Sequence, residues 1–412
     1  MSSGPKPARA RGVRSCMTTF ELRSLGRTLA AALVCWSTLS LTAPAQSSVR
    51  VIHATSKVVD IIDGEHHKRG GWYLFPGRKP DIYYVSIPRK PHRVIFRTDR
   101  DSIVLDSRYD DVHDFVILLN GVDSCRTRVI AKEKDVLRYA SVRRSAHQTS
   151  DTIPFTLGPN NRIYLSGQIN GSAPLNFQFD LGAGGSILRK GSVRKVAMTF
   201  DGTIFLHNSD GRNEVPTSSG NTLTIGPLTW KGNTTFAVAD NLDRSEDGLM
   251  GNSLLIDKVV EIDYDRRLMI VHDTLPPIPT GYHKRSIILD GVVPFVQADI
   301  VLAGDTLTNW YMFDTGYSGL LRLNAAASKP YKLGERARRA FNPFKATYTL
   351  PEFRIGGFAI ANLKGAVHEI RSDSLMGGLL GNELLKQFNV ILDNQNGDIY
   401  LRPNGLMVSR GR

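Results

Sequence analysis

The chain of 412 residues is long enough for about two to four domains of ordinary size. Its composition, 41% hydrophobic and 22% charged with 37 Gly and 20 Pro, excludes a disordered chain, a collagen and a protein with many membrane spans. Of the net charge of +13, five charges lie within residues 1–45, where six Lys/Arg face one Glu. The rest of the chain is only mildly basic and has no basic motif with interleaved aromatic residues, so we expect no nucleic-acid partner.

Residues 1–45 have the pattern of a secretory signal peptide. Basic residues precede an apolar run, Thr28–Thr42, and the small residues of Ala43-Pro44-Ala45 follow it. The run is too short and too rich in Ser and Thr for a membrane span. We expect cleavage before Gln46 and export to the periplasm or the extracellular space, with no stable membrane span afterwards. Cys125 is then the one cysteine left, so we expect neither an internal disulfide nor a cysteine-based metal site.

Residues 46–148 form a separate region. Strand-like runs of branched and aromatic residues occur at Ile82–Ile87, Arg93–Thr98 and Asp114–Asn120. These runs predict an all-β module, and no motif indicates its role. His66 and His67 stand beside Lys68, and we expect them in a solvated loop rather than at a metal.

The region after residue 150 contains an internal repeat, residues 150–274 and 282–405. Each copy has an apolar strand that ends in an aspartate and a glycine-bearing turn, then a strand ending in Ile-Gly, then an apolar-apolar-Gly-Asn element and another strand. The aspartates are Asp180 and Asp314, and the glycines of the later element are Gly251 and Gly381. The separations from Asp to Gly are 71 and 67 residues, so order and spacing both repeat.

The two copies predict two homologous β-lobes. Their strands are short and alternating, their turns are rich in glycine, and each has one brief helical segment. The predicted fold class is therefore mainly β, with two lobes preceded by the separate all-β module. Residues 275–281 join the lobes and contain enough proline for a semi-rigid linker.

The position of the two aspartates suggests a paired-carboxylate site. A strand end holds a side chain rigidly, and the following glycines let backbone approach it closely. If the copies pack about a pseudo-twofold axis, Asp180 and Asp314 meet there. Two carboxylates about 3 Å apart cannot both ionise, so they share one proton. One ionised and one neutral acid can activate a water and protonate a leaving amide.

These residues resemble the catalytic turns of the aspartic peptidases of the pepsin and retropepsin type, whose pattern is Asp-Thr/Ser-Gly-Ser/Thr/Ala. Asp314-Thr315-Gly316 matches the first three positions, and Asp180-Leu181-Gly182-Ala183 departs at the second. The family's element beneath the turn matches Leu249-Met250-Gly251 and Leu379-Leu380-Gly381. The resemblance covers residues 150–405 and is greatest to the two-lobed bacterial relatives with retropepsin-like lobes.

The resemblance implies a secreted bacterial hydrolase, an aspartic-type endopeptidase. Asp180 and Asp314 would share a proton and activate one water to hydrolyse peptide bonds, without a cofactor or a metal. The substrate would be a peptide or a protein. Both aspartates lie on one chain, so the active site does not require a homodimer.

Two departures from the family bear on activity. In the family the Thr beside each Asp bonds the opposite turn, and Leu181 has no hydroxyl for this, a loss of about 1 kcal/mol. Tyr317 stands where Ser, Thr or Ala is usual, and Ser318 is the nearest substitute. We therefore expect a less symmetric dyad, with weaker stabilisation of the carboxylates and a pH optimum closer to neutral than in pepsin-like enzymes.

The family also closes a hairpin flap over its substrate. Residues 204–216 fit this role, and Asp210-Gly211 is the predicted tip. The Tyr that pepsin-like members place on the flap is absent, and Phe205 and His207 are the nearest substitutes. Six Lys/Arg between Lys329 and Lys345 predict a solvated face, with a basic rim for acidic substrates as the alternative.

Two other functions remain open from the sequence. Because of Leu181 and Tyr317, the lobes could bind peptides without cleaving them. The protein could instead be an envelope interaction protein that acts through residues 46–148. Other enzyme classes lack their motifs, since the chain has no Gly-x-Ser-x-Gly, no His-Glu-x-x-His and no P-loop.

Overall fold

The computed structural model describes residues 49–407 except 78, 144, 146, 209–210, 241, 325–337, 341–346 and 369–375. The predicted signal peptide, residues 1–45, lies outside these residues. The described chain is mainly β, as predicted, and its helical segments are short: η1 (Lys190–Lys195), η2 (Asn252–Leu254) and α3 (Asn382–Leu385). Within the described residues, no helix has both the length and the apolar character needed to cross a membrane.

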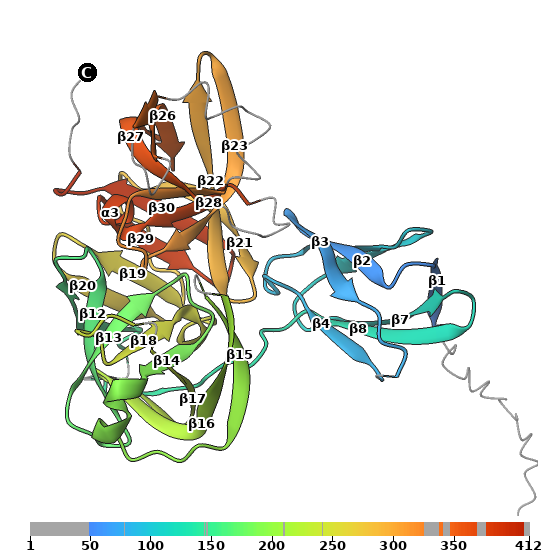
Figure 1. Ribbon diagram of the computed structural model, residues 1–412, viewed down its shortest axis with the longest axis horizontal. Coiled ribbons are helices and arrows are strands. Elements are labelled where there is room, and N and C mark those ends of the chain that lie inside the picture. The colour runs from blue at the N-terminus through green and yellow to red at the C-terminus, as the bar shows by residue number, and fades with distance from the viewer. Residues whose placement is uncertain are drawn as a thin grey trace, which may run out of the picture. The chain divides into compact units, whose positions relative to one another are not determined.

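The N-terminal module consists of two four-stranded sheets, ordered β1-β7-β8-β4 and β3-β2-β5-β6 (Figure 1). Buried and exposed residues alternate along strands such as β6, so one face of each sheet packs on a shared core. The strands are β1 (Arg50–Ala54), β2 (Val58–Asp63), β3 (His66–Tyr73), β4 (Asp81–Tyr84), β5 (His92–Arg97), β6 (Ser102–Ser107), β7 (Val112–Leu119) and β8 (Asp123–Ile130).

His66 is not in a solvated loop, and that prediction is wrong. The loop is the two-residue turn Gly64-Glu65, where Gly64 adopts the left-handed backbone conformation with φ of 60°. His66 is therefore the first residue of β3, opposite Asp63, and its side chain is only 4% exposed. Burial lowers the pKa of His66 to about 4, so the imidazole is neutral at ordinary pH.

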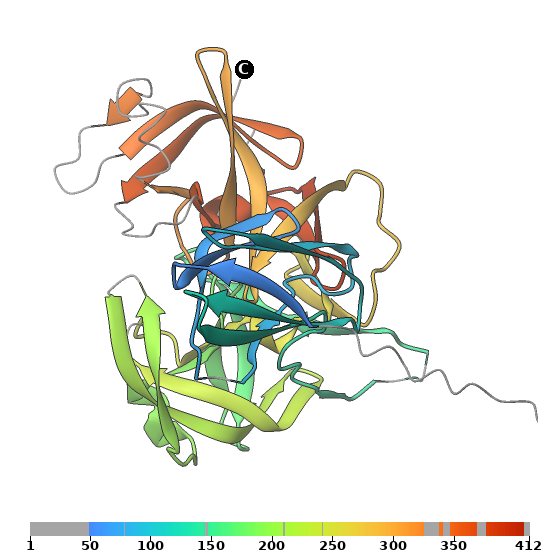
Figure 2. The same cartoon turned by 90° about the vertical axis from the view of Figure 1, so that its right-hand side faces the viewer.

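The first lobe is built on a nine-stranded sheet that includes β9 (Ala140–Ser141). Its two longest strands, β16 and β17, are joined directly, and β15 pairs with β16 as an antiparallel hairpin (Figure 2). The other strands of this sheet are β11 (Thr156–Leu157), β12 (Ile163–Ile169), β13 (Leu175–Asp180), β14 (Ser186–Arg189), β15 (Gly202–Asn208), β16 (Gly211–Ile225), β17 (Leu228–Ala239) and β18 (Gly248–Gly251).

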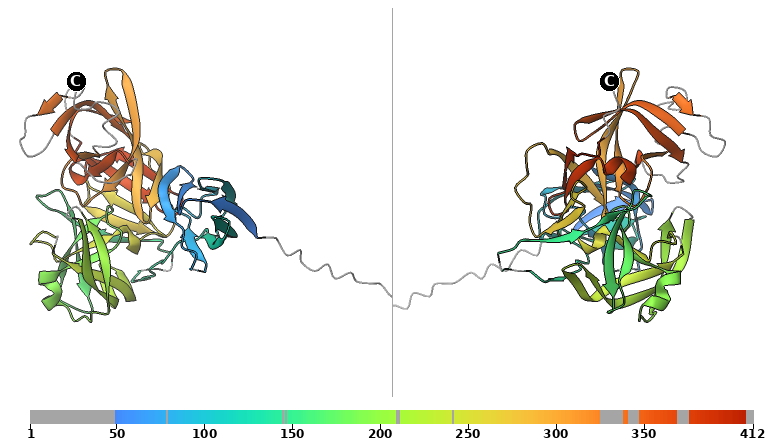
Figure 3. Two further views of the ribbon diagram at one scale, coloured as in Figure 1. Left: turned by 45° about the vertical axis from the view of Figure 1, so that its right-hand side comes forward. Right: turned by 90° about the vertical axis from the view of Figure 1, so that its left-hand side faces the viewer.

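The second lobe contains a long antiparallel hairpin, β22 with β23, in which Leu302 pairs with Asp305 beside the turn (Figure 3). Its strands belong to one half of a thirteen-stranded sheet. They are β22 (Val293–Leu302), β23 (Asp305–Asp314), β24 (Leu321–Asn324), β25 (Arg338–Ala340), β26 (Thr347–Ile355), β27 (Phe358–His368) and β28 (Gly378–Gly381).

The other half of the thirteen-stranded sheet joins the two lobes. The closing strands of the copies, β19 and β29, pair antiparallel at its centre. Residues of both lobes share one hydrophobic core, in which Phe177, Phe313 and Phe388 are fully buried. The joining strands are β10 (Ser150–Pro154), β19 (Val259–Asp263), β20 (Leu268–His272), β21 (His283–Asp290), β29 (Phe388–Asp393) and β30 (Asp398–Pro403).

Residues 275–281 form neither a helix nor a strand between β20 and β21. Leu275 and Ile278 nevertheless pack against a buried cluster on the joining sheet, so the first half of the segment is held in place.

Candidate active site

The strand pairings around the two aspartates are the same in both lobes. Asp180 ends β13, which runs parallel to β18 with Asp180 opposite Gly251. Asp314 ends β23, which runs parallel to β28 with Asp314 opposite Gly381. In each lobe the strand after the aspartate-bearing turn pairs antiparallel with the glycine-bearing strand. The glycine-bearing strand, β18 or β28, therefore lies between the strands before and after that turn. The repeated motif thus places each carboxylate at an equivalent strand end.

Glycine is required beneath each turn because backbone lies against it. A Cβ atom at Gly251 would lie 2.3 Å from the Ala183 carbonyl oxygen, and one at Gly381 would lie 2.1 Å from that of Gly319. Any side chain would displace the turn that carries the aspartate. This close approach explains why the motif has glycine at these positions.

The turn residues bring the two carboxyl groups into mutual hydrogen-bond contact. The Gly316 N–H lies between them and donates to Oδ1 of Asp314 at 2.9 Å and to Oδ1 of Asp180 at 3.1 Å. Each aspartate also accepts from its own turn, Asp180 from the Gly182 N–H at 2.8 Å and Asp314 from the Tyr317 N–H at 2.9 Å. The predicted dyad is therefore assembled from both lobes.

Gly182 and Gly316 make room for this contact. A Cβ atom at Gly182 would lie 2.7 Å from Cγ of Asp314, and one at Gly316 would lie 2.2 Å from Oδ2 of Asp180. A side chain at either position would therefore enter the space of the opposite carboxylate. Both aspartates remain partly accessible, as a group that reacts with substrate must be.

The surroundings of the two carboxyls differ. Burial raises the pKa of Asp180 well above its ordinary value, and the negative charge of Asp314 raises it further. Burial also raises the pKa of Asp314, but the bonds from Asp180, Tyr317 and Gly316 and the charge of Arg162 offset part of this rise. The surroundings therefore favour the shared proton on Asp180 and the negative charge on Asp314.

One threonine hydroxyl crosses between the two turns. Oγ1 of Thr315 accepts from the Leu181 N–H at 2.9 Å and donates to the Phe179 carbonyl at 3.0 Å. Thr315 is fully buried. Leu181 lies on the equivalent position of the other turn, but its side chain is fully buried in the core instead of crossing. The lobes are held here by one hydroxyl from the second lobe.

Tyr317 contributes its backbone to the site. Besides the N–H that binds Asp314, its carbonyl accepts from the Asn382 N–H at 2.7 Å. The Arg322 guanidinium lies 5.6 Å from the centre of the Tyr317 ring. The Ser318 carbonyl accepts from Nδ2 of Asn161 at 3.2 Å, so this turn is also tied to the first lobe.

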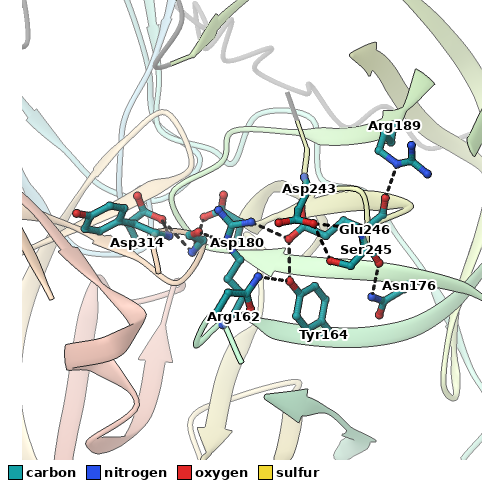
Figure 4. Close-up of polar contacts among 12 residues, drawn as sticks. Arg162, Tyr164, Asn176, Asp180, Arg189, Asp243, Ser245, Glu246 and Asp314 are labelled. Carbon is teal, nitrogen blue, oxygen red and sulfur yellow. Dashed lines mark hydrogen bonds and ion pairs between the residues drawn. The ribbon is translucent and has the colours of Figure 1, made fainter. Parts of the chain in front are cut away.

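An ion pair of the first lobe reaches the turn that carries Asp314, and the sequence analysis missed it (Figure 4). Nε of Arg162 donates to the Gly316 carbonyl at 2.8 Å, and its Nη1 donates to Oε1 of Glu246 at 2.8 Å. The Tyr164 hydroxyl donates to the same oxygen, and the Asp243 N–H donates to Oε2. Glu246 is fully buried. Burial alone would lower the pKa of Arg162, but Glu246 raises it overall, so the guanidinium stays charged.

The asparagine of each repeated Gly-Asn pair also connects the lobes. Nδ2 of Asn252 donates to the Val292 carbonyl at 2.8 Å, and Nδ2 of Asn382 donates to the Asn161 carbonyl. Both asparagines are fully buried. The sequence repeat contained this signal, because an asparagine directly follows the structural glycine in both copies.

The predicted flap residues, 204–216, lie in the hairpin of β15 and β16. Phe205 is 52% exposed, and the Arg212 guanidinium lies 3.9 Å from the centre of its ring. In the strand register His207 pairs with Arg212, and Gly211 pairs with Asn208. Asp210 of the predicted tip lies outside the described residues. A cavity of about 740 Å³ lies against the hairpin and is lined mainly by apolar side chains, among them Val193, Phe200, Leu206 and Val215.

The proposed basic stretch, Lys329 to Lys345, falls mainly outside the described residues. Within it the structure describes only the backbone of β25, whose Arg338 and Arg339 pair with β26. The solvated face predicted here, and the basic rim as its alternative, both stay predictions.

The fold and the site together define a mainly β protein with two lobes and a paired-aspartate centre. A family model described as an aspartyl protease matches residues 165–254, which include the turn of Asp180 and Gly251. No curated protein matches the chain significantly. The match supports an aspartic peptidase family. It ends before the second lobe, so the assignment of Asp314 to the site depends on the geometry of the structure alone.

Proposed function

We propose that the protein is an exported aspartic endopeptidase that hydrolyses peptide bonds with Asp180, Asp314 and one water. The observation that carries this proposal is the contact between the two carboxyl groups, with the Gly316 N–H donating to both. A buried pair that holds one proton is costly for a fold, and such groups are found where they do chemistry.

The mechanism follows from where the proton lies. Ionised Asp314 takes a proton from the bound water, whose oxygen attacks the peptide carbonyl carbon. Asp180 gives its proton to the carbonyl oxygen, which becomes the second hydroxyl of a tetrahedral diol. Asp314 then transfers its proton to the amide nitrogen, Asp180 takes one back from a hydroxyl, and the C–N bond breaks. The products are a carboxylic acid and an amine, and the dyad returns to its starting state.

The departures at Leu181 and Tyr317 do not remove the parts that this mechanism needs. The Tyr317 backbone N–H binds Asp314, and the Leu181 backbone N–H is fixed by Thr315. The lost hydroxyls therefore alter the symmetry of the site, while three backbone N–H groups still orient the carboxylates.

The test is peptide cleavage by residues 46–412 across pH 3–8, with a library of random peptides as substrate. Asp180→Asn and Asp314→Asn remove one carboxylate each, and Asp106→Asn is the matched control at an exposed carboxylate. Cleavage by the wild type and the control that is lost in both dyad variants supports the proposal. Cleavage that survives in both dyad variants contradicts it.

Two other outcomes would support the alternative functions. Peptide binding without cleavage would indicate the non-catalytic peptide-binding protein that Leu181 and Tyr317 suggest. Neither cleavage nor binding would point to an interaction protein that acts through residues 46–148.

A further inference from the structure

We propose that Arg162, held by the buried carboxylate of Glu246, is a positioning residue that places the negative charge of the dyad on Asp314 and its proton on Asp180. This inference rests on the proposed function for its catalytic meaning. The position of the charge can also be measured without activity, from the pH dependence of the free energy of unfolding.

A single peptide group connects Arg162 to Asp314. The Gly316 carbonyl, which accepts from Nε of Arg162, belongs to the same planar peptide unit as the Tyr317 N–H, which donates to Asp314. A hydrogen bond to the carbonyl oxygen polarises the peptide unit and strengthens the hydrogen bond that its N–H donates on the other side. The guanidinium therefore fixes the orientation of this unit and makes its N–H a better partner for a charged carboxylate.

Glu246 and its neighbours keep Arg162 in place. Glu246 is fully buried, and its two oxygens accept from Arg162, Tyr164 and the Asp243 N–H. Each carboxylate oxygen therefore has at least one hydrogen-bond donor. Arg162 is itself largely buried, with a quarter of its side chain exposed. A planar, two-point contact of this kind orients a guanidinium more tightly than a single bond would.

Among the described residues of the second lobe, no ion pair takes the equivalent place. The repeated asparagines donate to equivalent carbonyls, Asn382 to that of Asn161 and Asn252 to that of Val292. The residues that follow these carbonyls, Arg162 and Val293, are therefore counterparts. Gly248 and Gly378 are the first residues of β18 and β28 and pair with β13 and β23 in the same way. Glu246 and Met376 stand two residues before these glycines, so they are also counterparts. A charged pair in one copy thus corresponds to an apolar pair in the other, so the twofold symmetry is broken on the side that faces Asp314.

Two further cations near the Asp314 turn, Arg322 and Lys386, interact with groups other than Asp314. Nζ of Lys386 donates to Oδ1 of Asn161 at 2.7 Å, and Arg322 lies over the Tyr317 ring. The charged and titratable groups that the described contacts place around this turn include Asp180, Arg162, Glu246, Tyr164, Tyr317, Arg322, Lys386 and Glu383, whose backbone N–H donates to the Gly319 carbonyl. Arg162 is the cation whose charge favours the ionised form of Asp314, and the Gly316–Tyr317 peptide unit links it to that carboxyl.

The principal variant is the double substitution Arg162→Val and Glu246→Met, which gives the first lobe the apolar pair of the second. It removes both charges together, so no buried carboxylate is left unpaired. Arg162→Lys keeps the charge with fewer donors. Arg189→Met is the matched control, because Arg189 also bonds the Glu246 backbone, at its carbonyl, but makes no contact with the Gly316 turn among those described.

The first readout is the pH profile of kcat/KM. The double variant should raise the pKa of the acid limb by about half a pH unit to one unit. A nearby positive charge lowers a carboxyl pKa by roughly one to three units, and the negative charge of Glu246, which is lost in the same variant, offsets part of that effect. Arg162→Lys should show less than half of this shift, and Arg189→Met should show none. A fall in kcat/KM at every pH with the acid limb unmoved would show a merely structural role and overturn the proposal.

The second readout is the free energy of unfolding by urea, measured from pH 3 to pH 8 on the same chains. The inflection that reports ionisation of the dyad should move upward in the double variant and stay in place in Arg189→Met. If the wild type cleaves no peptide, the proposed function fails while this shift still supports the charge placement. An inflection that does not move overturns the charge placement whatever the activity.

Discussion

The hydroxyl of Thr315 gives the sharpest test of how the two turns are held. It accepts from the Leu181 N–H and donates to the Phe179 carbonyl inside a fully buried site. Thr315→Val keeps the shape and removes both bonds, whereas Thr315→Ser keeps the hydroxyl and removes a methyl group. The pair of variants therefore separates the hydrogen bonds from the packing.

The magnitudes follow from burial. A net bond is worth about 1 kcal/mol, and a buried N–H without a partner costs about 1–3 kcal/mol, so Thr315→Val should lose about 2–4 kcal/mol of unfolding free energy. Thr315→Ser should lose about 1 kcal/mol for the buried methyl group. Because the Leu181 N–H adjoins Asp180, the valine variant should also lose about tenfold or more in kcat/KM.

Urea unfolding at pH 6 and kcat/KM on one cleaved peptide measure both effects. The serine variant should stay close to the wild type in each, and the valine variant should fall well below it. Equal stability of the two variants would refute the reasoning, because it would mean that the crossing hydroxyl contributes no more than the methyl group.

Three further predictions follow from burial and charge. Leu181→Thr should destabilise the fold by about 1–3 kcal/mol, since the lost apolar burial exceeds one regained hydrogen bond, and a stabilised variant in urea unfolding would contradict the packing of Leu181. Asp180→Asn should become more stable relative to the wild type as pH rises above about 4: the raised pKa of Asp180 makes the wild type lose stability there, and a pH-independent difference would refute this. Asp63→Asn should cost about 2 kcal/mol at pH 7, because the bond from His92 helps to hold the pKa of Asp63 at about 2 against burial, which alone would raise it. This contribution should fade as pH falls from about 4 to 2, and a cost that persists at pH 2 would contradict it.

The sequence predicted the features of the fold that repeat. Alternating strands and glycine turns have a local signature, and two copies of one motif reveal which aspartates and glycines matter. The register confirms the logic of the motif, because Gly251 and Gly381 lie opposite the aspartates that precede them by many residues. Packing around one twofold relationship then brings both aspartates together.

The features that the sequence did not reveal are those that break the repeat. Arg162 and Glu246 are 84 residues apart, and each lies in an ordinary polar turn. A motif comparison between the copies discards such residues because the second lobe has apolar ones in their place. His66 was misplaced for a different reason, since a two-residue turn is short enough to bring a polar residue into the buried face of a strand.

The central claim is that one proton shared by Asp180 and Asp314 drives hydrolysis of a peptide bond. The most direct measurement is kcat/KM of Asp180→Asn and Asp314→Asn, made on preparations whose unfolding by urea is measured beside them. The account predicts that each variant loses at least about a thousandfold in kcat/KM while remaining folded. A folded variant of either kind that cleaves peptide at the rate of the wild type would contradict it.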